Sequence, residues 1–159
     1  MLRAAFRQTV WIGGVMVAAA CASVRSSSPG VDERARVEAA TQRYAALIRA
    51  APVDSVLTAY TENGELEIPG VGTLKGRKAI HDFLAPLTAA VSVAATEMRS
   101  DSIAVTGNVA RSTGHYRQVA GPKGGPAAEY RGVFHATWAR EADGQWRISR
   151  LLMEPMKSP

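Results

Sequence analysis

The sequence contains little of the chemistry that disulfides, metal centres or nucleic-acid surfaces require. One cysteine occurs among 159 residues, so no disulfide can form within the chain. The three histidines, His81, His115 and His135, show no short ligand spacing, and we expect no metal site and no cofactor. Basic residues are dispersed, and the aromatic residues, 6% of the chain, do not interleave with them. Nucleic acid is therefore not an expected partner.

The sequence also lacks an apolar run of about 20 residues, which is the length that a transmembrane helix needs to span a bilayer. The N-terminal run, residues 10–20 (VWIGGVMVAAA), follows two arginines and precedes a Cys-Ala-Ser sequence. A basic start, a short apolar run and a small-residue cleavage site are typical of a secretory signal. The sequence therefore predicts a signal peptide over residues 1–20 and an exported protein of the periplasm or cell envelope.

The single cysteine, Cys21, lies at the end of this apolar run. Ala18-Ala19-Ala20-Cys21 resembles a bacterial lipobox, in which the cysteine is lipidated and becomes the mature N-terminus, although Ala18 stands where leucine is usual. We expect lipidation at Cys21, which would provide the only membrane contact. Two alternatives stay open, namely ordinary cleavage after Ala20 or Ala22 and an uncleaved anchor.

After a polar, turn-prone tether over residues 21–30, the pattern predicts one domain over residues 31–156. Apolar residues at helical spacing indicate a helix ending near Ala51, a short helix beginning at Asp54 and closed by Asn63-Gly64, and a third after Gly76. The expected strands cover 65–68, 91–98 with a weak continuation at 103–106, 109–119, 129–141 and 145–153, the last two joined by an Asp143-Gly144 turn. Helices followed by consecutive antiparallel strands predict the α+β class.

Three stretches, taken in order, carry a resemblance to a known family. They are TQRYAALIRAAPVDSVLTAYTENGELEIPG, GRKAIHDFL and YRGVFHATWAREADGQWRISRLL. Together they resemble the nuclear transport factor 2-like superfamily, particularly its SnoaL-like and ketosteroid-isomerase-like branches, over about residues 32–154. The resemblance implies a cone, in which a curved antiparallel sheet wraps around a long N-terminal helix and encloses an apolar interior. It does not fix the activity, because the superfamily includes enzymes, binders and scaffolds.

The resemblance also indicates where isomerase chemistry would reside. In ketosteroid isomerases, an aspartate before the proline that follows the first strand moves the substrate proton, and a second aspartate donates into an oxyanion hole. The matching positions here are Ile68 and Ala136, which cannot carry a proton. Tyr44 matches the tyrosine that completes that hole, and Tyr60 a supporting tyrosine. Isomerase activity is therefore not expected.

The family register and strand alternation predict an apolar ligand pocket with a few phenolic hydroxyls. We expect its lining to include Tyr44, Tyr60, Phe83, Tyr116, Phe134, Ala136, Trp138, Leu151 and Met153. Small-molecule sites commonly have this composition. The leading hypothesis is thus a pocket that binds a small hydrophobic molecule.

Two other functions are considered. Glu65 and Glu67 share one face of the first strand, and with Tyr44 they would be the acid–base candidates of a SnoaL-like isomerase, dehydratase or cyclase if that face entered the pocket. We expect that face to be exposed instead. In the other alternative, the open sheet face, which would carry His135 and Thr137, pairs two copies in a homodimer.

Overall fold

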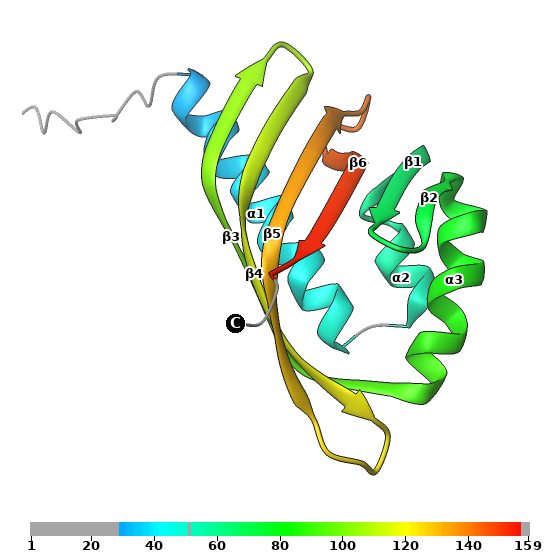
Figure 1. Ribbon diagram of the computed structural model, residues 1–159. Helices are drawn as coiled ribbons and strands as arrows, with labels where there is room; N and C mark the ends of the chain where they lie inside the picture. The colour runs from blue at the N-terminus through cyan, green and yellow to red at the C-terminus, as the bar shows by residue number, and fades with distance from the viewer. Residues whose placement is uncertain (1–28, 51, 157–159) are drawn as a thin grey trace, which may run out of the picture.

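The computed structural model describes residues 29–50 and 52–156, in which a long helix lies against a curved, six-stranded sheet (Figure 1). The expected signal peptide, Cys21 and all but the last two residues of the expected tether lie outside the described residues. Within the described ranges, no helix is long and apolar enough to cross a membrane.

Three helices lie in the first half of the domain, as the sequence predicts. Helix α1 covers Pro29–Ala50, and its stripe of Val37, Ala40 and Tyr44 is buried. Helix α2 covers Val53–Leu57, and helix α3 covers Gly76–Ala90. The break before α2 falls at Pro52, which disfavours helical geometry in the preceding residue.

The sheet has the strand order β2-β1-β6-β5-β4-β3. Its strands are β1 (Tyr60–Ile68), β2 (Gly72–Lys75), β3 (Val91–Thr106), β4 (Val109–Pro122), β5 (Ala128–Arg140) and β6 (Trp146–Pro155). Strands β3 to β6 form the expected antiparallel meander, and β1 runs parallel to β6. The α+β prediction is therefore confirmed, with one parallel pair that the sequence pattern did not reveal.

The first strand corrects an expectation, because Asn63-Gly64 does not close a helix but lies inside β1. The pairing of β1 with β6 shifts register between Tyr60 and Glu65, as a bulge does. A Cβ on Gly64 would lie 2.9 Å from the carbonyl oxygen of Ile148, so the close approach of β6 requires glycine there. The short strand β2 was not predicted, β3 is one continuous strand, and β4 continues into the expected loop as far as Pro122.

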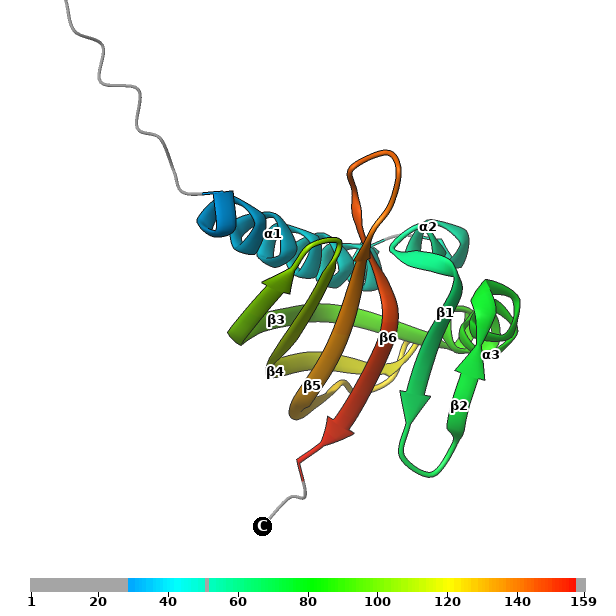
Figure 2. The same ribbon diagram turned by 90° about the horizontal axis from the view of Figure 1, so that it is seen from above.

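The two ends of the sheet differ in how they are covered. Helix α1 packs along the concave face, whereas α2 and α3 lie beside β1 and β2 (Figures 1 and 2). The apolar core is one cluster with members from all three helices and from the sheet. Its part between α1 and strands β4 to β6 contains Phe134, Trp138 and Ile148, which are among its largest fully buried members. We call this region the packed end.

Candidate functional site

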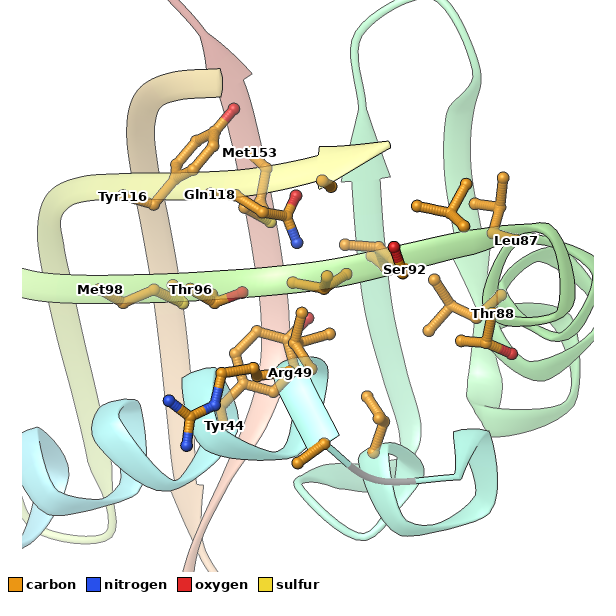
Figure 3. A pocket seen from close by; sticks show the side chains of 18 of the residues that line it. Tyr44, Arg49, Leu87, Thr88, Ser92, Thr96, Met98, Tyr116, Gln118 and Met153 are labelled. Carbon is orange, nitrogen blue, oxygen red and sulfur yellow. The ribbon is translucent and has the colours of Figure 1, made fainter. Parts of the chain in front are cut away.

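The opposite region encloses a cavity of about 560 Å³, which we call the open-end cavity. It lies among the C-terminal part of α1, helix α3, the first half of β3 and the second half of β4 (Figure 3). Apolar side chains dominate the lining, among them Ile48, Leu66, Phe83, Leu84, Val93, Met98 and Met153. A volume of roughly 300–1,000 Å³ is typical of small-molecule pockets.

Polar residues are the minority of this lining. The hydroxyl-bearing members are Tyr44, Thr88, Ser92, Thr96 and Tyr116, and Gln118 pairs with Thr96 across β3 and β4. Arg49 and Lys123, both exposed, are the cationic members of the lining. Of the residues that the structure describes, no aspartate, glutamate or histidine lines the cavity. The lining therefore offers hydrogen bonds and positive charge but no carboxylate or imidazole to move a proton.

The innermost polar feature is a pair of tyrosine hydroxyls. The hydroxyl oxygens of Tyr44 and Tyr60 lie 2.8 Å apart, and the two rings meet edge to face with their centroids 5.7 Å apart. Burial raises the pKa of Tyr44 to about 12, against the lowering effect of the hydrogen bond from Tyr60. Burial, together with the proximity of Tyr44, also raises the pKa of Tyr60. Both phenols thus stay protonated at neutral pH.

The backbone around Tyr60 holds this pair in place. The Arg77 Nε donates a 3.1 Å hydrogen bond to the Tyr60 carbonyl oxygen, which ties the start of α3 to the start of β1. Tyr60 itself is fully buried and lies behind Tyr44, so only Tyr44 reaches the cavity. A bound molecule could therefore accept a hydrogen bond from Tyr44 while Tyr60 donates to the Tyr44 oxygen.

Tyr116 depends on a glycine in the neighbouring strand. It pairs with Gly132, and a Cβ built there would lie only 2.4 Å from the Tyr116 ring. The Tyr116 ring therefore occupies the space over Gly132 at the cavity wall, a position that any larger residue at 132 would block. Burial raises the pKa of Tyr116, so its hydroxyl is also protonated at neutral pH.

The expected lining divides between the two ends. Tyr44, Phe83, Tyr116 and Met153 line the open-end cavity. The other five expected residues do not, namely Tyr60, Phe134, Ala136, Trp138 and Leu151, each at most 4% exposed. This placement corrects the sequence expectation, and the reason is that the concave face of β5 and β6 is filled by side chains of the packed end. Trp138, for example, donates from its indole nitrogen to the Ser112 hydroxyl over 2.9 Å.

Several lining residues lie outside the predicted set, because most of that set belongs to β5 and β6. The wall of β3 contributes Val91, Val93, Thr96 and Met98, and β1 contributes Leu66 and Ile68. The sequence predicts a strand over residues 91–98. It does not show which face of that strand borders the cavity.

The positions that would hold the isomerase carboxylates are apolar, and only one of them faces the cavity. Ile68 lines the cavity, as a proton-accepting residue at this point of β1 would. Ala136 is buried in the packed end opposite Ser112 and Leu151. The geometry thus places no proton carrier at either position.

Glu65 and Glu67 lie on the face of β1 that points away from the cavity. Glu65 pairs with Lys75 at 3.4 Å, and Glu67 pairs with Arg150 at 2.6 Å. Leu66 and Ile68, the alternate residues, face the cavity instead. Neither glutamate is therefore positioned to act with Tyr44 on a bound molecule.

Glu38 on α1 is another carboxylate that lies near the interior. One of its oxygens is buried without a partner among the described residues, while the other accepts a 2.8 Å hydrogen bond from Gln42. Gln42 also donates to the Met98 carbonyl oxygen, so this part of α1 is fastened to β3. Glu38 does not belong to the cavity lining.

The three histidines lie apart, each beside a carboxylate. His81 contacts Asp54 and Asp82, His115 contacts Asp101 at 2.6 Å, and His135 contacts Glu154 at 3.4 Å. All three histidines and their carboxylate partners are partly exposed to solvent. In residues 29–50 and 52–156, no three potential ligands of the His, Cys, Asp and Glu types gather at one point.

Comparison with known proteins places these features in context. Residues 30–151 match the SnoaL-like domain family. A solved ketosteroid isomerase-like protein from Erwinia carotovora atroseptica aligns with a TM-score of 0.71 at 19% identity, covering 80% of this chain and 98% of that chain.

Two solved proteins from Novosphingobium aromaticivorans are also similar. One, an NTF2-like protein with a cystatin-like fold, has a TM-score of 0.66 at 20% identity and covers 81% of this chain and 85% of its own. The other, a putative aromatic ring hydroxylase, has a TM-score of 0.69 at 20% identity, with 83% and 94% covered. At these identities the likeness concerns the fold. The chain matches none of the curated proteins.

Proposed function

The chain belongs to the SnoaL-like domain family, and from this premise we propose that it binds a small hydrophobic molecule in the open-end cavity without ketosteroid-isomerase chemistry. The observation that carries the proposal is the composition of that cavity. It has about 560 Å³, apolar walls and no carboxylate or histidine among its described lining residues. Burial of apolar ligand surface would supply the affinity, at about 25 cal/mol per Å² of area removed from water.

Tyr44 would give such a ligand its orientation. Its hydroxyl is protonated, partnered by Tyr60 and held on the rigid helix α1. A carbonyl or hydroxyl oxygen of the ligand that enters the apolar region would need a partner there, because an unpaired buried polar group is costly. Without a base, Tyr44 polarises a bound carbonyl but turns nothing over.

The proposal is tested by titration with N-phenyl-1-naphthylamine, an uncharged dye whose fluorescence rises in apolar surroundings. The purified protein should bind about one dye per chain. Ala120→Trp places an indole ring in the cavity and should abolish dye binding. The control Ala104→Trp makes the same change at an exposed position of β3 and should leave dye binding intact.

Circular dichroism establishes that both variants are folded, and Val93→Trp replaces Ala120→Trp if the latter does not fold. Absence of dye binding to the unmodified protein, or equal binding by Ala120→Trp and Ala104→Trp, would refute the proposal.

We also propose that the protein is exported and held at the cell envelope by a lipid on Cys21. The support is the N-terminal pattern of two arginines, an apolar run and a lipobox-like sequence. Metabolic labelling with an alkyne fatty acid should mark the wild-type protein in the membrane fraction, and Cys21→Ser should remove the label. An unlabelled protein in the cytoplasmic fraction would contradict both parts.

Pairing of two copies through the convex sheet face remains a prediction. That face carries opposite charges close together, including Arg117 between Glu97 and Glu129. His135 also lies there, half exposed beside Glu154. Sedimentation velocity of the purified protein should give a dimer that weakens with salt, and a monomer at all concentrations would exclude it.

A further inference from the structure

We infer that the ligand of the open-end cavity is an amphipathic anion, with an apolar body inside and one negative group at the rim. The inference rests on the proposed function, since it names the chemical class of the molecule that the cavity takes. It starts from the distribution of charge in the lining, which is one-sided. Arg49 and Lys123 are present, and no acidic residue among those described accompanies them.

The two cations are distinguished by lining the cavity without a carboxylate partner. Arg117 on β4, for example, is paired with carboxylates, whereas Arg99 and Arg111 have none within 4.0 Å among the described residues but lie outside the lining. Among the described residues, Arg49 and Lys123 have no carboxylate within 4.0 Å. Their charges therefore act on whatever occupies the rim, and they favour a negative group there.

A second observation points to a polar part of the ligand near the same wall. The Thr96 hydroxyl oxygen is buried and has no hydrogen-bond partner among the described residues. Thr96 and its paired residue Gln118 line the cavity from β3 and β4, above the end of α1 that carries Arg49 (Figure 3). An unpaired buried hydroxyl costs free energy, and rotation of the Thr96 side chain about χ1 towards a ligand oxygen would remove that cost.

A purely structural role for the two cations is the competing explanation. Arg49 lies in the last turn of α1, and the Lys123 amide donates to the Ala90 carbonyl oxygen at the end of α3 over 2.9 Å. Cations at helix C-termini offset the partial negative charge of the helix dipole. That role would make both residues matter for stability but not for the choice of ligand.

Two dyes with one skeleton separate these explanations. N-phenyl-1-naphthylamine is uncharged, and 8-anilinonaphthalene-1-sulfonate adds a single sulfonate to the same rings. The affinity of the unmodified protein for the sulfonate dye should be about 3- to 10-fold higher than its affinity for the uncharged dye, as expected for partly exposed ion pairs. Because the rim is exposed, this ratio should fall towards one as sodium chloride increases.

The matched variants are Arg49→Gln and Lys123→Gln, with Arg34→Gln and Lys78→Gln as controls at exposed positions outside the lining. The rim variants should lose the preference for the sulfonate and keep their affinity for the uncharged dye. The controls should keep both. Thermal unfolding of each variant measures the structural role separately.

Each possible result bears either on the inference or on the proposed function. Equal binding of the two dyes by the unmodified protein would overturn the inference while leaving the proposed function standing. A preference for the sulfonate that survives in Arg49→Gln/Lys123→Gln, which carries both rim substitutions, would do the same. A loss of thermal stability in the rim variants with an unchanged preference would assign them to the helix ends and also overturn it. If neither dye binds, the proposed function itself fails.

Discussion

The packed end and the open end of this domain are built from the same sheet, yet one is solid and the other hollow. At the packed end, α1 and strands β4 to β6 enclose Phe134, Trp138 and Ile148, each 2% exposed or less. At the open end, the concave face continues along β3 and β4 beyond the end of α1, where α3 provides only one wall. The difference therefore arises from helix length and not from residue hydrophobicity.

Both ends use an aromatic ring laid across a glycine of the neighbouring strand. Phe134 covers Gly114 at the packed end, and Tyr116 covers Gly132 at the open end. Phe134 is surrounded on all sides, whereas Tyr116 has a hydroxyl on the cavity wall. One packing device thus contributes stability in one place and a candidate ligand contact in the other.

The largest expected effect is the difference in unfolding free energy between a substitution at the packed end and one at the open end. Trp138→Ala should lower the free energy of unfolding by about 3–5 kcal/mol, because it leaves a cavity and removes the partner of Ser112. Leu87→Ala at the rim, where Leu87 is 43% exposed, should change it by less than about 0.5 kcal/mol. Urea unfolding measures both, and similar losses would remove the distinction between the ends.

The tyrosine pair at the boundary of the two ends should make the protein sensitive to alkali. The pKa of Tyr44 is raised to about 12, so its contribution is fully present below the unfolded pKa near 10 and is lost as pH rises towards 12. Two pKa units correspond to about 2–3 kcal/mol. Unfolding free energies between pH 9 and 12 should decline more steeply for the unmodified protein than for Tyr44→Phe/Tyr60→Phe. Equal slopes would contradict the burial of the pair.

Breaking the same pair at neutral pH should have a somewhat smaller effect. Tyr44→Phe leaves the buried Tyr60 hydroxyl without its partner and should cost about 1–3 kcal/mol of unfolding free energy. Tyr44→Phe/Tyr60→Phe should cost less than the sum of the single changes, because both polar groups are then removed. Additive losses in a double-mutant cycle would show that the hydroxyls do not interact.

The smallest expected effect concerns the outer face of β1. Glu67→Gln breaks a partly exposed pair with Arg150 and should cost less than about 1 kcal/mol. Binding of N-phenyl-1-naphthylamine should be unchanged, since Glu67 lies outside the cavity lining. Altered dye affinity in this variant would mean that the glutamate reaches the interior.

The sequence predicts most of this fold because its local signals are strong. Helical spacing in α1 and α3, the break at Pro52 and the Asp143-Gly144 turn each correspond to the observed structure. Asn63-Gly64 misled the prediction because the pair is a common turn sequence, whereas here Gly64 serves the close approach of β6. A long-range contact of this kind leaves no local pattern.

The candidate site was less accessible to sequence reasoning for a related reason. Strand alternation, combined with the family register, predicts that Tyr116 and Trp138 face the interior, and both are buried. It does not show how far α1 extends over that face, and this extent decides that Tyr116 borders a cavity while Trp138 is packed. The sequence shows that position 68 lacks the isomerase base. It does not show that the Ile68 side chain forms part of the cavity wall.

One pair of substitutions tests the hollow open end most directly. Ala120 and Ala136 are both buried on the concave face, at 7% and 4% exposure, but only Ala120 lines the cavity. Ala120→Leu should change the free energy of unfolding by less than about 1 kcal/mol, whereas Ala136→Leu overfills a packed region and should cost about 1–3 kcal/mol or more. Equal costs at the two positions in urea unfolding would contradict the account.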